Sequence, residues 1–281
     1  MKVAAVCAMA LGGLPLGMIT TGEKSSNAQP NATMTAASST SESCCQAMLD
    51  ACSTIMQRLA PYKEIILNES KSQLLSPQEV FVKAVKAADK DRVCLSAKGW
   101  SAPISKNAFQ YYAYCAAAVQ VELDVLTGQI QLLSAHISYD CGKQLNAAVD
   151  VGQIEGGFVM GLGYFLTESV IHDLADGKLV SNNTWKYKPL AGSDMPRVFN
   201  VRLLKDSFNE APGCVLRSKS TGEPPLVCAS AAHFAVREAI IAARRDIGAT
   251  EDFQLDIPAT VAHRHVACMV DSSQFKLPVG M

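Results

Sequence analysis

The sequence predicts an α+β (mixed α/β) fold, in which a β-hairpin region is flanked by several helices. Apolar residues recur at helical spacing from Cys44 to Leu59 and again from Leu226 to Arg245. Between them, Phe109 to Tyr139 alternates apolar residues with small or polar ones, and Leu126-Thr127-Gly128-Gln129 is a turn signal. With 49% hydrophobic and 18% charged residues among 281, the chain can build a packed core.

The chain begins with MKVAAVCAMALGGLPLGMITTG, which combines one lysine, an apolar run and small residues. Two interpretations fit this stretch: a secretory signal, or a short core helix from Val3 to Leu11 that ends at Gly12-Gly13. The run is too short, and too interrupted by glycine and proline, to span a membrane.

Two further helices follow a Ser/Thr-rich stretch, Thr20 to Ser43, that resembles a linker. The helix from Cys44 to Leu59 would take Ser41 or Ser43 as its N-cap. The motif Ser76-Pro77-Gln78-Glu79 has the form of a capping box with proline at the first helical position, so a helix is expected to about Ala88.

Asn146 to Glu168 predicts a helix that is unusually rich in glycine. Each helical glycine costs about 1 kcal/mol relative to alanine, and the cost is tolerated where something packs close to the backbone. A phosphate-binding loop is the alternative, although the spacing matches neither a Walker A nor a dinucleotide motif. One helical face carries the apolar residues Val151, Ile154, Phe158, Leu162 and Phe165. A strand at Phe199 to Leu204 and a short helix at Val261 to Met269 complete the predicted elements.

Charge and cysteine usage exclude several classes of protein. The formal net charge is −1 and no basic stripe occurs, which argues against a nucleic-acid binder. None of the ten cysteines forms a C-x-x-C pair, so structural zinc and iron–sulfur sites are disfavoured. Most of the cysteines lie in apolar runs and are expected to be buried thiols.

Glu223 stands out in the stretch SKSTGEPPL, between Gly222 and two prolines. Pro224 restricts the backbone of Glu223 to extended conformations, so the carboxylate has a set direction near a helix N-terminus. Local sequence alone favours a helix-capping carboxylate over a catalytic one. Gln153 lies in the glycine-rich helix, where a polar amide needs a hydrogen-bond partner, and that partner is either another protein group or a ligand. The hydroxyl-rich stretch Thr33 to Ser41 is either a solvated loop or a binding site for an anion at a helix N-terminus.

Four ordered stretches together resemble the C-terminal part of the molybdenum-cofactor domain of the xanthine dehydrogenase/aldehyde oxidase family. The likeness extends from about residue 2 to residue 272, and the GEPPL block is closer to the xanthine dehydrogenases. The matching stretches are N-x-x-x-TAAS (Asn31 to Ser38), VELDVLTG (Val121 to Gly128), LNAAVDVGQIEGGFVMGLG (Leu145 to Gly163) and SKSTGEPPL (Ser218 to Leu226).

The resemblance implies roles for individual residues. Glu223 matches the family's general base, and the backbone of Ala37 matches a position close to molybdenum. Gln153 matches an amide beside the pterin, and the glycines around it match a close approach of the cofactor. The implied cofactor-binding residues are Ala37, Ser38, Ser39, Ser41, Gln153 and Gly222. Two positions depart from the family pattern: Glu42 stands where an Asp-like residue is usual, and Asn146-Ala147 stands where Asn-Pro is usual.

The implied activity is hydroxylation of a purine, an N-heterocycle or an aldehyde, with water as the oxygen donor and molybdenum–molybdopterin as the cofactor. The family also uses 2Fe–2S clusters and FAD, but the chain has no counterpart of their domains, nor of the family's substrate-orienting residues. We expect the partners to be the substrate and the remainder of the molybdenum domain or other subunits, without nucleic acid or membrane. The location is expected to be cytoplasmic, with the peroxisome as an alternative.

The resemblance also implies how the chain is organised. Residues 1–281 would form a single incomplete molybdopterin-binding domain, the C-terminal portion of a two-lobed whole, with a C-terminal extension at 250–281. Met1 would then stand inside a longer ancestral domain, and the apolar N-terminal run would be an internal helix. Two alternatives to a molybdenum hydroxylase stay open: a non-catalytic fragment or docking module, and one subunit of a split enzyme.

Overall fold

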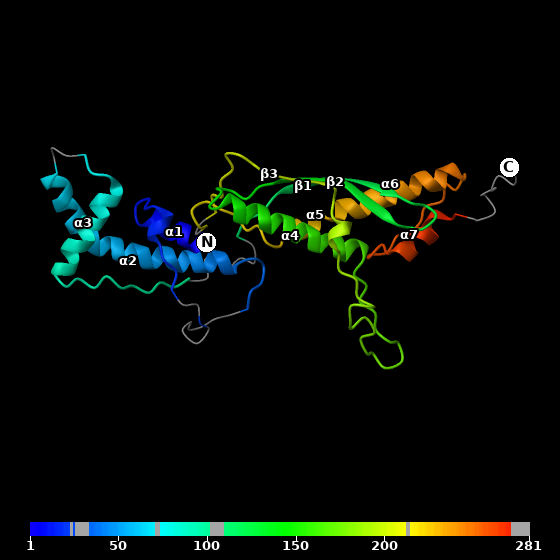
Figure 1. The fold of residues 1–281 in the computed structure, drawn as a ribbon, viewed down its shortest axis with the longest axis horizontal. Coiled ribbons are helices and arrows are strands. Elements are labelled where there is room, and N and C mark those ends of the chain that lie inside the picture. Colours follow the sequence, from blue (N-terminus) through cyan, green and yellow to red (C-terminus); the bar gives the residue numbers. More distant parts are fainter. Residues whose placement is uncertain (23–24, 26–33, 71–73, 102–109, 212–213, 271–281) are drawn as a thin grey trace. The chain divides into compact units, whose positions relative to one another are not determined.

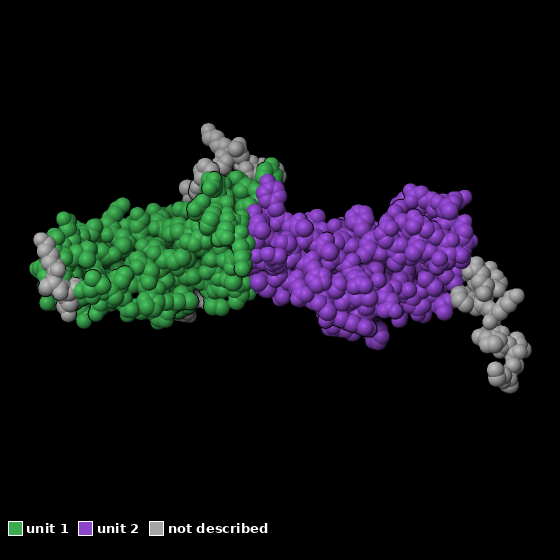
Figure 2. All heavy atoms as spheres, turned by 90° about the horizontal axis from the view of Figure 1, so that it is seen from above, with its two compact units in different colours: residues 1–112, 141–150, 205–220 green, residues 113–140, 151–204, 221–281 purple. Residues whose placement is uncertain are grey.

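The computed structural model describes residues 1–22, 25, 34–70, 74–101, 110–211 and 214–270. The first residues of the TAAS motif, 31–33, and the end of the expected extension, 271–281, lie outside this range. The chain forms two compact units (Figure 2). Unit 1 consists of residues 1–112, 141–150 and 205–220, and unit 2 of residues 113–140, 151–204 and 221–281. The expected division into one incomplete domain and an extension stays a prediction.

Unit 1 is built on three helices: α1 (Lys2–Ala10), α2 (Thr40–Glu69) and α3 (Pro77–Lys90) (Figure 1). The predicted N-terminal helix is therefore present, and it packs against α2 around the buried side chains of Val6 and Cys45. The pairing of α2 with α3 buries a second apolar cluster, formed by Leu59, Ile66, Val80, Ala84 and Ala88.

The predicted bounds of α2 were wrong at both ends. The helix begins at Thr40 with Ser39 as its N-cap, rather than after Ser41 or Ser43, and it continues through Pro61 to Glu69 instead of ending at Leu59. A proline inside a helix removes one backbone hydrogen bond. The apolar residues beyond it pack against α3, and this tertiary burial offsets the loss.

The capping box of α3 is confirmed. The Ser76 hydroxyl accepts a hydrogen bond from the Glu79 amide at 3.3 Å, and the Glu79 carboxylate accepts one from the Ser76 amide at 2.8 Å. These two bonds satisfy donors that the first turn of a helix otherwise leaves unpaired.

Unit 2 contains a three-stranded sheet in the order β1 (Cys115–Leu123), β2 (Ile130–Tyr139), β3 (Val198–Leu203). The strands β1 and β2 form the predicted antiparallel hairpin, whereas β3 pairs with β2 in parallel. In the hairpin turn, the Asp124 carboxylate accepts hydrogen bonds from the Leu126 amide at 2.9 Å and the Thr127 hydroxyl at 2.8 Å. Gly128 adopts φ +73°, which glycine allows without strain.

Four helices complete the described part of the chain: α4 (Ala147–Leu166), α5 (Pro225–Cys228), α6 (Ser230–Asp246) and α7 (Val261–Cys268). The apolar run after Glu223, predicted as one helix, is divided at Ala229 into α5 and α6. Among the described residues, the helical stretch Pro224–Asp246 is long and apolar enough to cross a membrane. The core helix of a soluble protein can have the same length and composition. In α6, Val236 and Ile240 are fully buried, and the helix contacts β1.

The expectation of buried thiols holds only in part: Cys44 and Cys94 are exposed, and two further cysteines are not free thiols. Cys115 at the start of β1 and Cys228 at the end of α5 form a disulfide. The two residues are 113 positions apart in the chain, so no local pattern linked them. They meet because α5 and α6 contact β1.

The predicted apolar face of α4 is confirmed at its centre, where Ile154, Phe158 and Leu162 are fully buried. Phe158 contacts Phe199 of β3 with ring centroids 5.5 Å apart. Leu166 extends this face and is 1% exposed. In unit 2, α4 is therefore a core helix that lies beside the sheet.

Arg264 of α7 ties three parts of unit 2 together, and local sequence did not identify it. Its buried guanidinium donates to the carbonyls of Ala259 at 2.6 Å, Gly128 at 2.8 Å and Leu166 at 3.4 Å. Burial lowers the pKa of Arg264 to about 10, so it still carries its charge at neutral pH. Its carbonyl partners belong to the hairpin turn, the end of α4 and the approach to α7.

Candidate functional site

The Gly222-Glu223-Pro224-Pro225 segment forms the entry into α5 (Figure 1). Pro224 is the N-cap residue and Pro225 the first helical residue, so Glu223 stands one position before the cap rather than at it. The Glu223 carbonyl accepts a hydrogen bond from the Leu226 amide at 3.1 Å, and its side chain is exposed. The backbone of Glu223 is thus part of a tight turn, and the residue as a whole is exposed.

Two glycines of α4 hold this segment at backbone contact. A methyl group added at Gly157 would lie 2.7 Å from the Gly222 carbonyl oxygen. One added at Gly161 would lie 2.3 Å from the Leu226 carbonyl oxygen and 2.7 Å from the Ala229 side chain. Real methyl groups do not approach other atoms this closely, so only glycine permits the packing. The turn that carries Glu223 therefore rests on α4.

A second pair of glycines lies on the solvent-facing side of α4. Methyl groups added at Gly152 or Gly156 would meet nothing within 4 Å. Gln153 is exposed beside them, and Met160 and Tyr164 continue the same stripe with 69% and 56% of their surfaces exposed. The expectation that all these glycines allow close approach of a cofactor is therefore wrong for Gly157 and Gly161, which pack against the chain's own backbone. For Gly152 and Gly156 it stays a prediction.

In unit 1, the described part of the TAAS motif is a sharp loop that leads into α2. Ala37 and Ser38 adopt φ values of +51° and +53°, a region that residues other than glycine rarely occupy. The Ser39 hydroxyl donates to the Ala36 carbonyl at 2.8 Å. Ala37, Ser39 and Ser41 are exposed, and Ser38 is partly buried. The predicted cradle residues thus lie at a helix N-terminus, where Ser39 already uses its amide and hydroxyl within the loop.

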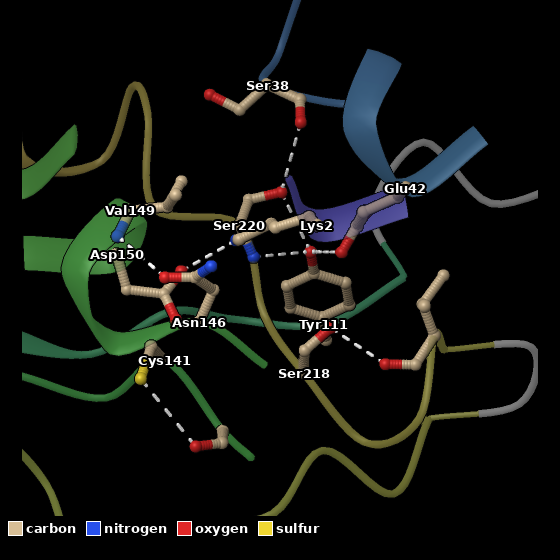
Figure 3. Close-up of polar contacts among 12 residues, drawn as sticks. Lys2, Ser38, Glu42, Tyr111, Cys141, Asn146, Val149, Asp150, Ser218 and Ser220 are labelled. Atoms are coloured by element: carbon tan, nitrogen blue, oxygen red, sulfur yellow. Dashed lines mark hydrogen bonds and ion pairs between the residues drawn. The ribbon is translucent and has the colours of Figure 1, made fainter. Parts of the chain in front are cut away.

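A partly buried polar cluster lies beside this loop within unit 1 (Figure 3). The Tyr111 hydroxyl donates to the Glu42 carboxylate and accepts from the Ser220 amide at 2.9 Å. The Ser220 hydroxyl lies 3.0 Å from the Tyr111 oxygen and 3.4 Å from the Ser38 carbonyl oxygen. Tyr111 therefore connects the first turn of α2 with the residue three positions before Glu223.

Burial shapes the protonation of this cluster. Desolvation raises the pKa of Glu42, opposed by the hydrogen bond from Tyr111 and by the charge of Lys2. Desolvation and the bond to Glu42 raise the pKa of Tyr111 to about 12, so Tyr111 keeps its proton at neutral pH. Lys2 forms an ion pair with Asp150 at 2.6 Å, and both side chains are largely buried.

The space among these side chains is small. A cavity of about 10 Å³ is lined by residues that include Lys2, Glu42, Lys219 and Ser220. That volume holds a single water molecule at most, so the cluster is not a ligand pocket. The sequence analysis had named Ser38 as a cofactor-binding residue and Glu42 as a departure from a family pattern, and Ser220 lies in the SKSTGEPPL stretch, but it had not named Tyr111. The only feature of the sequence that could have drawn attention to Tyr111 is its place among three tyrosines, at positions 111, 112 and 114, just before β1.

The predicted site residues fall into two groups. Gln153, Gly222 and Glu223 belong to unit 2, where α4 and the turn before α5 pack together. Ala37, Ser38, Ser39 and Ser41 belong to unit 1, at the start of α2. The catalytic and cofactor-binding roles of all seven residues stay predictions.

Comparison with known sequences identifies the family. Residues 1–196 match the family model of the molybdopterin cofactor-binding domain. The chain is 39% identical over 272 residues to xanthine dehydrogenase from Drosophila pseudoobscura pseudoobscura, covering 93% of this chain and 19% of the relative. It is 38% identical over 246 residues to a putative aldehyde oxidase-like protein from Oryza sativa subsp. japonica, covering 85% of this chain and 18% of that protein. The chain thus spans about a fifth of the length of these relatives.

Solved structures show the same fold. CO dehydrogenase from Oligotropha carboxidovorans matches with a TM-score of 0.74 at 15% identity, over 95% of this chain and 33% of that one. Quinoline 2-oxidoreductase from Pseudomonas putida 86 matches with a TM-score of 0.74 at 19% identity, over 95% and 34% of the two chains. The expected fold and the expected resemblance are therefore confirmed. The chain belongs to the molybdopterin cofactor-binding domain family.

Proposed function

We propose that this chain forms part of a xanthine dehydrogenase-like molybdenum hydroxylase and that Glu223 is its general base. The substrate class is a purine, a related N-heterocycle or an aldehyde, and water supplies the oxygen. The observation that carries the proposal is the backbone contact between α4 and the turn at residues 222–226. This contact holds the residues on either side of Glu223 against a core helix, and Glu223 itself is exposed.

The residues of each unit fit a cofactor that is bound mainly through backbone and amide groups. In unit 2, Gly152 and Gly156 leave the surface of α4 open beside Gln153, so a flat ring system can approach the backbone there. In unit 1, Ala37, Ser38, Ser39 and Ser41 lie at the N-terminus of α2, where the helix dipole favours an anionic group such as a phosphate. Gly222 would line the approach to Glu223.

The chemistry follows from these positions. When bound, molybdenum–molybdopterin supplies the centre that accepts the two electrons of the oxidation. The Glu223 carboxylate takes the proton of the attacking water and holds it on a carboxylate oxygen, which makes the water oxygen a stronger nucleophile toward an electron-poor carbon of the substrate. Pro224 and the contact with α4 fix the backbone from which that carboxylate projects, so less ordering is needed when the reaction occurs.

The remainder of such an enzyme must come from elsewhere. Because the chain spans about a fifth of its relatives, the substrate-orienting residues and the 2Fe–2S and FAD modules would belong to further sequence or to partner subunits. A split enzyme, in which a partner chain completes the cofactor domain, is the second candidate. A non-catalytic docking module is the third. We place the enzyme in the cytoplasm as part of the same proposal.

Molybdenum and pterin content separates these candidates. The protein should be purified alone and together with any partner that co-purifies, and both preparations analysed for the metal and the pterin. Metal present in the complete assembly supports a molybdenum hydroxylase, and metal that appears only with a partner chain supports the split enzyme. Absence of metal from both preparations would rule out the two enzymatic candidates.

A substitution then tests the role of Glu223. In a preparation that holds molybdenum, Glu223→Gln should keep the metal and lower turnover of xanthine or hypoxanthine by at least about a hundredfold, because the proton acceptor is lost. Glu238→Gln, an exposed carboxylate of α6, is the matched control and should leave turnover unchanged. Full turnover in Glu223→Gln would refute the assignment.

A further inference from the structure

We propose that Tyr111 is a positioning residue that fastens two segments of unit 1 to the first turn of α2: the loop at residues 35–38, and residues 218–220, which form the approach to Glu223 along the chain. The catalytic part of this inference rests on the proposed role of Glu223. Tyr111 itself lies outside all the family motifs that pointed to the site. Its hydroxyl is the shared point of contact for Glu42 and Ser220 (Figure 3).

In the approach to Glu223, three consecutive backbone amides, those of residues 218 to 220, each donate a hydrogen bond. The Ser218 amide donates to the Val215 carbonyl at 2.9 Å, and the Lys219 amide donates to the Cys141 carbonyl at 2.8 Å. The next amide, that of Ser220, donates to the Tyr111 hydroxyl at 2.9 Å, which is a side-chain partner from a distant part of the chain. Tyr111 thus holds the last of these three amides before the turn at residues 222–226.

Tyr111 is in turn held by α2. Its single hydroxyl proton is donated to Glu42, so its oxygen is left to accept from the amide of Ser220. A hydrogen bond to a partly buried carboxylate is stronger than one between neutral groups. Because Glu42 lies in the first turn of a 30-residue helix, the tyrosine oxygen has a well-defined position.

The same contacts reach the predicted cofactor loop. The Ser220 hydroxyl lies within 3.4 Å of the carbonyl oxygen of Ser38. Ala37 and Ser38 both have positive φ values, which cost free energy and persist only where the surroundings hold them. Through Ser220, Tyr111 therefore connects the strained loop to the segment that leads to Glu223.

Amide hydrogen exchange tests the positioning without requiring any activity. In the intact protein, Tyr111→Phe should accelerate exchange at residues 35–41 and 218–222 by at least about tenfold, while α3 (Pro77–Lys90) stays as protected as before. The matched control is Tyr112→Phe, which removes the same atom from an exposed neighbour and should change neither segment. Unchanged exchange in Tyr111→Phe, or acceleration that is uniform over unit 1, would overturn the proposal.

Two further variants keep the test decisive if Tyr111→Phe does not fold. Ser220→Ala removes the hydroxyl but keeps the amide, so exchange should accelerate at residues 35–38 while the amide of residue 220 stays protected. Glu42→Gln keeps an oxygen that accepts from Tyr111 and should retain most of the protection, whereas Glu42→Ala should lose it. Equal behaviour of the Gln and Ala variants would contradict the role of the Glu42–Tyr111 bond.

Turnover separates this inference from the proposed function. In a molybdenum-containing preparation, Tyr111→Phe should lower kcat by at least about tenfold with less than a twofold change in KM or metal content, because only the aim of Glu223 is relaxed. Normal kcat with faster local exchange would make Tyr111 a purely structural residue and leave Glu223 as the base. If Tyr111→Phe accelerates local exchange but the molybdenum-containing wild-type protein shows no turnover, the anchor stands and the proposed function is refuted instead.

Discussion

Helix α4 carries two pairs of glycines with the same spacing along the chain, and one pair is closely packed while the other is open to solvent. Gly157 faces the turn into α5 and Gly161 faces α5 itself, both at distances that exclude any side chain, whereas Gly152 and Gly156 face open space beside Gln153. Both pairs are spaced four residues apart, so each forms a short stripe along the helix. The comparison teaches that one glycine-rich helix can serve two purposes, a close packing contact for its own chain and an uncovered surface for something else.

The largest expected effect is at Gly161. Gly161→Ala places a methyl group 2.3 Å from the Leu226 carbonyl oxygen, and the net destabilisation should be about 3 kcal/mol from overpacking. Urea unfolding of unit 2, followed by circular dichroism, measures this loss. A variant as stable as the wild type would mean that the turn before α5 does not rest on α4.

Gly157→Ala should be less costly. Its methyl group would meet the Gly222 carbonyl oxygen at 2.7 Å and Pro225 at 3.3 Å, so a small shift of the turn relieves part of the clash, and the loss should be about 2 kcal/mol. The same unfolding experiment checks the value. Since Gly222 adjoins Glu223, this variant should also lower turnover in a molybdenum-containing preparation, and normal turnover would count against a fixed carboxylate direction.

The open pair should behave in the opposite way. Gly152→Ala and Gly156→Ala should each raise the free energy of unfolding of the cofactor-free protein by about 0.5 to 1 kcal/mol, because alanine favours the helix and nothing opposes its methyl group. If the surface beside Gln153 receives the pterin, both variants should also lose molybdenum during purification. Improved stability with undiminished metal content would separate this surface from the cofactor.

The smallest expected effect concerns pH on the packed side of α4. His233 of α6 lies against Phe165 with ring centroids 6.3 Å apart, and burial lowers the pKa of its imidazole from 6.5. The unfolded chain therefore binds a proton more readily than the folded chain, and stability should be complete above about pH 6.5 and fall as the pH drops below it.

The midpoint of urea unfolding between pH 5 and pH 7.5 measures the effect of His233. His233→Gln should flatten the pH dependence, whereas His136→Gln, at an exposed position of β2, should leave it unchanged. A wild-type midpoint that stays constant across this range would mean that His233 binds a proton as readily in the folded protein as in the unfolded chain.

The local elements were largely predictable because their signals are local. The capping box at Ser76, the hairpin turn at Asp124 to Gln129 and the apolar face of α4 depend on residues close together in the chain. The misplaced bounds of α2 and the break at Ala229 depend on contacts with distant residues, against which local preference is weak. The parallel β2–β3 pair and the Cys115–Cys228 disulfide were missed for the same reason.

The sequence by itself determined the family, since the TAAS loop, the Gln153 helix and the GEPPL turn occur together and in order. It also determined which carboxylate to consider, because Gly222 and the prolines single out Glu223. Only the tertiary structure decided which glycines of α4 are packed and which are open. Only the tertiary structure brought Tyr111 and Ser220, 109 positions apart, into one hydrogen-bonded cluster. The physical reason is that contact depends on distance in space, and no spacing along the chain encodes the neighbours that folding supplies.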